Sequence, residues 1–216
     1  MMMRKVRMMM AAVVTASATI AATSAAVAQT PAYIRAAPDA ATKAFGQATS
    51  GRIFSDAWTP MRLGLVKRSQ QAIPGFECPA EPQVALAQVI PFPIKPGAIS
   101  WIERFVVGCK PATIRNFLMI LEGEQPRAIE LLPGQTNADP QLQRDALLGA
   151  AGFAGTVGAK DCKQRVVIDT RITTPPSPTG WVERWTHDVC GTWAEVDVTF
   201  TPSPRGGTDW RARLVK

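Results

Sequence analysis

The sequence predicts an α+β fold, mostly antiparallel β, with two pseudo-symmetric halves of one helix and four strands each. The string Trp181-Val182-Glu183-Arg184-Trp185 has a near copy, Trp101-Ile102-Glu103-Arg104-Phe105. A Pro-rich stretch precedes each copy, and two cysteines bracket it at similar spacing. Matching features in one order indicate an internal repeat. We expect a single duplicated domain over 51–216, with halves at about 54–134 and 135–216. An all-β sandwich with a bridging helix is the alternative.

Residues 1–28 are typical of a secretory signal peptide. Arg4, Lys5 and Arg7 precede a mostly apolar stretch that is too short to span a bilayer comfortably. Ala26-Val27-Ala28 matches a cleavage site, so cleavage is expected after Ala28. The product would be periplasmic or secreted. Residues 29–50 are rich in Ala, Thr, Gln and Pro and are predicted to form a mobile leader with a short helix after Asp39.

Charge and motifs exclude several classes of function. The formal net charge is +7, and the basic residues are spread along the chain, as expected of a solvated surface or of attraction to anionic envelope polymers. No basic–aromatic motif points to nucleic acid, and beyond the signal peptide no segment is long and apolar enough for a membrane span. Gly206-Gly207 lacks the Lys-Ser/Thr pair of a phosphate loop, and no cofactor is predicted.

The four cysteines indicate disulfides, because an even number in an exported chain fits an oxidising compartment. The repeat favours the pairs Cys78–Cys109 and Cys162–Cys190, although the sequence alone permits two other pairings. A zinc site is the competing interpretation. The cysteines lack metal-ligand spacing and the chain has one histidine, so no metal site is predicted.

In the first half, residues 54–71 are weakly periodic and predict a helix that starts near Pro60, with an apolar stripe of Trp58, Met61, Leu65 and Val66. Strands are expected near 83–91, 99–108, 112–121 and 127–132, and residues 122–126 are typical of a hairpin turn.

In the second half, Asp139 as N-cap and Pro140 at the first position predict the clearest helix. Its apolar face would hold Leu142, Ala146, Leu147, Ala150 and Phe153. Residues 166–172 and 194–200 alternate between apolar and polar, which predicts strands covered on one face. Cys190-Gly191 predicts a tight turn, and a last strand is expected at 209–215.

The last forty residues or so carry a motif formed by 180–185, Cys190-Gly191, 198–202 and 206–208. This W-x-E-x-W…CG…F-x-P pattern resembles that of a family of uncharacterised secreted proteins of Gram-negative bacteria. The first copy departs from it at Phe105 and Lys110. The resemblance implies export and no known activity, so it assigns no catalytic residue.

The repeated string supplies the candidate site, because residues two apart on a strand share a face. Trp181, Glu183 and Trp185 form one set, and Trp101, Glu103 and Phe105 the other. One interpretation is structural: the rings cover a neighbouring element and Glu103 pairs with Arg115. The other is an aromatic platform with an acidic centre that binds a sugar ring or a cation. If the copies face each other, Glu103 and Glu183 form a carboxylate pair for glycoside hydrolysis.

His187 lies beside Asp188, but no G-x-S-x-G motif supplies a nucleophile. It is interpreted as a surface residue at a strand end. The sequence favours a disulfide-stabilised exported binding or interaction module, without enzymatic activity, whose partner is an envelope component or a protein. The alternative is an envelope polysaccharide or peptidoglycan hydrolase that uses the carboxylate pair.

Overall fold

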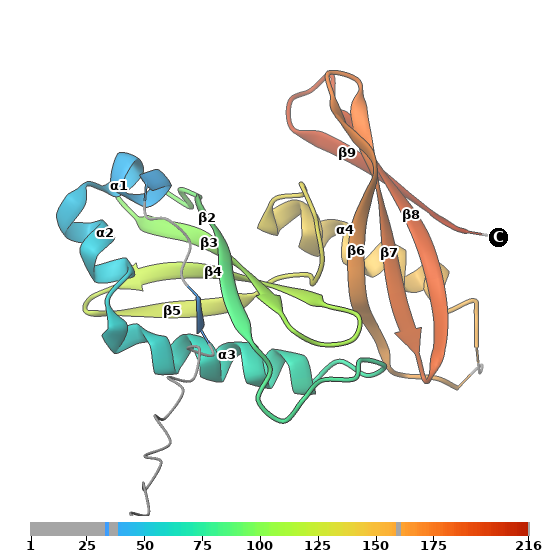
Figure 1. Cartoon of the computed structure of the whole chain (residues 1–216). Helices are drawn as coiled ribbons and strands as arrows, with labels where there is room; N and C mark the ends of the chain where they lie inside the picture. The colour runs from blue at the N-terminus through green and yellow to red at the C-terminus, as the bar shows by residue number, and fades with distance from the viewer. Residues whose placement is uncertain (1–32, 35–38, 159–160, 216) are drawn as a thin grey trace, which may run out of the picture. The chain divides into compact units, whose positions relative to one another are not determined.

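The computed structural model describes residues 33–34, 39–158 and 161–215. The predicted signal peptide lies outside the described residues. The first half holds α1 (Asp39–Phe45), α2 (Gln47–Ile53), a 3-10 turn at Asp56–Trp58 and α3 (Thr59–Gln71), followed by β2 (Val84–Pro91), β3 (Ile99–Val107), β4 (Thr113–Glu122) and β5 (Gln125–Glu130). These four strands form an antiparallel meander, and the short β1 (Tyr33–Ile34) pairs in parallel with β2 (Figure 1).

The second half repeats the order of elements from α3 onward. Helix α4 (Pro140–Ala154) precedes β6 (Arg165–Ser177), β7 (Gly180–Val189), β8 (Thr192–Pro202) and β9 (Thr208–Leu214). These strands form a second antiparallel meander in the order β6-β7-β8-β9 (Figure 1). The strands and α4 therefore form close to where the sequence predicts them.

The strand registers of the two halves agree. Trp101 lies opposite Met119 and Arg104 opposite Asn116, while Trp181 lies opposite Phe200 and Arg184 opposite Asp197. Each sheet also has its own apolar core, one around Trp101 and Phe105 and the other around Trp185 and Phe200. The α+β fold with two similar halves is therefore confirmed. The all-β alternative is wrong, because a sandwich would bury the faces of both sheets in one shared core.

The two main helices bury different kinds of side chain. Asp139 caps α4 and accepts a hydrogen bond from the Leu142 N–H, as predicted. The residues predicted for the inner face of α4 face the sheet, with one exception. Phe153 is 45% exposed, and Ala154 is buried in its place. Helix α3 buries Val66 but also the polar Arg62, Ser69 and Gln70. Its weak apolar periodicity therefore reflects a polar inner face.

Part of the segment predicted to be a mobile leader packs on the domain. Helix α1 begins at Asp39, as expected, and buries Ala41 fully. Helix α2 buries Ser50 and Ile53, and Ala41 and Ile53 belong to the first core. Among the described residues, no helix is both long and apolar enough to cross a membrane.

Both predicted disulfides are present, Cys78–Cys109 and Cys162–Cys190. The second joins the segment after α4 to the tight turn between β7 and β8. In that turn Cys190 has φ 51° and Gly191 φ 86°, which suits a two-residue hairpin loop of the primed type. In each half, the bridge joins the segment before the first strand of the four-stranded meander to the end of the second strand of that meander.

We expect the double variant Cys162→Ser/Cys190→Ser to unfold more easily. The bridge closes a loop with a sequence separation of 28 residues, and losing it should lower the free energy of unfolding by about 3 kcal/mol, because the unfolded chain regains entropy. Urea unfolding of the oxidised proteins, followed by tryptophan fluorescence, measures the change. An unchanged midpoint would contradict the proposed stabilisation.

Candidate functional site

Glu103 lies in the first core under α3, where it is fully buried. Nε and Nη2 of Arg62 on α3 donate to its carboxylate at 2.5–3.1 Å. The indole N–H of Trp101 donates to Oε1 at 2.9 Å. Arg62 is itself fully buried and also donates to the Ile53 carbonyl at 2.6 Å. The pair therefore joins β3 to α3 and to the end of α2.

Glu183 is also fully buried, but neutral groups surround it. The indole N–H groups of Trp181 and Trp185 donate to its two carboxylate oxygens, each at 2.9 Å. The Thr136 hydroxyl and the backbone N–H groups of Asn137 and Ala138 donate as well, at 2.8–3.2 Å. Glu183 therefore accepts five hydrogen bonds, and three of them fix the segment before α4 on the second sheet.

The structure does not bring the two predicted carboxylates together. Each lies in its own core, and neither lines the two cavities described below. Trp101, Phe105 and Trp185 are fully buried. Trp181 is partly buried and stacks on Phe200, with ring centroids 4.8 Å apart. Three of the four predicted platform rings are thus covered by protein in this structure, and Trp181 is covered in part.

The predicted pairing of Glu103 with Arg115 is wrong. Arg115 lies opposite Phe105 on β4 and donates from Nε and Nη2 to Oε1 of Gln70 on α3. Burial lowers the pKa of Arg115 to about 10, against the opposing effect of Glu130 and Asp169. A strand neighbour was expected to neutralise Glu103, whereas the partner comes from the helix above the sheet.

His187 is fully buried, so the prediction of a surface residue is wrong. It follows Trp185 on the helix-facing side of β7, opposite Val167 and Ala194. Neither ring nitrogen has a hydrogen-bond partner among the described residues. Burial lowers the pKa of His187 to about 4. Asp188 instead accepts a hydrogen bond from the Gly191 N–H, so no His–Asp pair forms.

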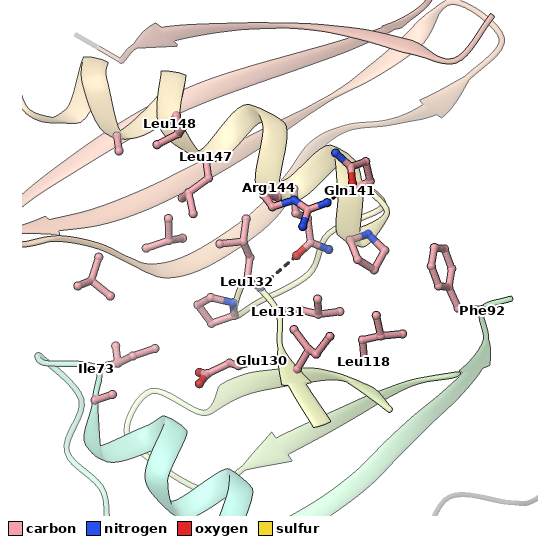
Figure 2. Close-up of a pocket in the computed structure, with 18 of the residues that line it drawn as sticks. Ile73, Phe92, Leu118, Glu130, Leu131, Leu132, Gln141, Arg144, Leu147 and Leu148 are labelled. Carbon is pink, nitrogen blue, oxygen red and sulfur yellow. Dashed lines mark hydrogen bonds between the residues drawn. The ribbon is translucent and has the colours of Figure 1, made fainter. Parts of the chain in front are cut away.

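An apolar groove of about 970 Å³ lies between α4 and the outer face of the first sheet. Figure 2 shows Leu147 and Leu148 of α4 on one side and Leu118 of β4 on the other, with Leu131 and Leu132 between them. Leu148 is 83% exposed and Ile129 38% exposed. The polar side chains of the wall include Gln141, Arg144, Arg165 and Glu130. An exposed apolar surface of this kind is typical of a binding site.

A smaller cavity of about 310 Å³ adjoins the groove, because Phe92, Leu131 and Gln143 line both. Arg104 of β3 and Asn116 of β4 belong to its wall. Its other side is the segment 136–139, which leads into α4. The smaller cavity is therefore the more polar end of a continuous lining.

Sequence reasoning missed the groove, because its wall comes from six stretches of the chain that lie far apart. One local signal was present. Leu142, Ala146 and Ala150 already supply a face for the sheet, and Leu147-Leu148 adds apolar surface beside it. A helix that is apolar on more than one face has a second surface to cover.

Comparisons with protein-family profiles, with curated proteins and with solved structures found no match. In the part of the chain that the structure describes, no group of three or more His, Cys, Asp or Glu side chains could hold a metal ion.

We expect Glu103→Gln and Glu183→Gln each to lower the free energy of unfolding by roughly 3 kcal/mol or more, since buried donors lose their acceptor. At Glu183, at least two donors would face an amide NH2 group. The control is Glu195→Gln, which removes partly exposed pairs with Arg171 and Arg184 and should cost less than about 1 kcal/mol. Urea unfolding measures all three. Full stability together with loss of a hydrolytic activity would instead support the carboxylate-pair hypothesis.

We expect acid to destabilise the fold through His187. The folded pKa of about 4 lies below the ordinary value of 6.5, so the unfolded chain takes up a proton first as the pH falls. The contribution of neutral His187 to the free energy of unfolding is fully present above pH 6.5. It is lost between pH 6.5 and pH 4, by about 3 kcal/mol in total. His187→Phe should lack this loss. Urea unfolding of both proteins across this range measures the difference, and a difference independent of pH would contradict the assignment.

Proposed function

We propose that the protein is an exported binding module that holds an acyl chain in the apolar groove between α4 and the first sheet. The groove itself carries the proposal. Its volume of about 970 Å³ lies at the upper end of the range of roughly 300–1,000 Å³ typical of ligand pockets. Bound ligand would also cover the exposed side chains of Leu148 and Ile129.

The chemistry of the wall favours a hydrocarbon chain over a sugar. Aliphatic side chains dominate it, and Phe92 is its only aromatic residue in the part of the chain that the structure describes. Sugar sites combine stacking rings with many polar groups, and the tryptophans that the sequence offered for this role do not line the groove. Arg144 and Arg165 outnumber Glu130 in the described wall of the groove, and the resulting positive charge suits a ligand from a negatively charged envelope.

Export rests on the predicted signal peptide and is supported by the two disulfides, which persist in oxidising compartments. The alternative function was an envelope hydrolase that uses Glu103 and Glu183. Binding is the better-supported function, because both carboxylates are fully buried in separate cores and already hydrogen-bonded.

Dodecanol tests the proposal as an uncharged probe with the same hydrocarbon chain, and calorimetric titration measures its binding. We expect Leu148→Gln to weaken dodecanol binding roughly tenfold, because a leucine that the ligand buries contributes about 1.5 kcal/mol or more. Phe153→Gln is the matched control, since Phe153 is an exposed apolar residue of the same helix that does not line the groove. The Phe153→Gln variant should bind dodecanol with the same affinity as the unmodified protein. Absence of dodecanol binding, or equal effects of the two changes, would refute the proposal.

A further inference from the structure

The two halves differ at a matched pair of residues, which lies on the face turned away from α3 in the first sheet and away from α4 in the second. In the second half, Nε of Arg184 donates to the carboxylate of Asp197 at 2.8 Å. In the first half, Nε of Arg104 donates at 3.0 Å to the amide oxygen of Asn116. Because both pairs hold the same register, the first half has an amide where the second has a carboxylate. Arg104 therefore lacks the counter-charge that Arg184 has.

The other partners of Arg104 are neutral as well. Nη1 donates to the side-chain oxygen of Gln88 and Nη2 to the Thr136 carbonyl. A guanidinium has five N–H groups, so one N–H remains on each terminal nitrogen. Two such groups suit the two oxygens of one carboxylate.

Nearby acids do not neutralise Arg104 by contact. Asp139 is the one acidic residue in the described wall of the smaller cavity, and its carboxylate caps α4. Glu183 attracts Arg104 at longer range, yet burial lowers the pKa of Arg104 more than Glu183 raises it. A partly desolvated cation thus faces a cavity that adjoins the apolar groove.

We propose that Arg104 binds the carboxylate of a free fatty acid whose hydrocarbon chain lies in the groove. The assignment rests on the proposed function and adds the polar end of the ligand. Phe92 and Leu131, which line both cavities, would contact the first carbons of the chain. A bound carboxylate would supply in the first half the charge that Asp197 supplies in the second.

The test compares dodecanoate with dodecanol at neutral pH by calorimetric titration on the full mature chain. We expect dodecanoate to bind roughly tenfold more tightly, as a charge-assisted pair contributes more than a neutral one. Gln88→Glu is the sharpest variant, because the near-isosteric carboxylate would pair with Arg104 in place of the ligand. This change and Arg104→Gln should each remove the preference for dodecanoate over dodecanol.

Arg184→Gln is the matched control and should keep the preference, and circular dichroism checks that every variant is folded. Equal binding of the two probes to the unmodified protein, or a preference that survives Gln88→Glu, would overturn the role of Arg104 while leaving the acyl site intact. If neither dodecanoate nor dodecanol binds, the acyl site itself is refuted. Binding to anionic phospholipid vesicles without binding of free dodecanoate would also overturn the assignment to a free fatty acid.

Discussion

A carboxylate inside an apolar core destabilises a fold unless donors surround it, and this protein buries one in each half. Glu103 obtains its donors from Arg62 and Trp101, and Glu183 from two indoles, Thr136 and two backbone N–H groups. In both halves some donors come from outside the sheet. The carboxylate therefore fixes α3 on the first sheet and the segment before α4 on the second.

The two carboxylates have different partners, and the difference links the halves. Arg62 neutralises Glu103 within its own core. Glu183 has no ion pair among the described residues, and Thr136 connects it to Arg104 of the other half, because the Thr136 hydroxyl donates to Glu183 while its carbonyl accepts from Arg104. The connecting segment is held tightly nearby. A side chain at Gly134 (φ 87°) would meet the Thr170 backbone at 2.2 Å, so this approach requires glycine.

The local pattern of the sequence was enough to predict the strands, α4 and the disulfide pairs, because alternation, capping and repeated cysteine spacing all act over short distances. The same pattern could not tell whether the face that carries Trp101 and Glu103 lies open or under a helix. That depended on α3, whose inner face includes Arg62, a residue with no apolar signature. The groove was missed for a related reason, since it forms only where remote segments meet.

Similarity between the halves helps to separate folding from binding. The buried Glu and its indole donors occur in both halves, so they answer a need that both share, which is to hold a helix or its leading segment on a sheet. The groove between α4 and the first sheet is not needed to hold either helix on its own sheet. Its specificity must come from positions where the halves differ. The pair of Arg104 with Asn116 is such a position, because its equivalent is a closed ion pair and it borders the cavity itself.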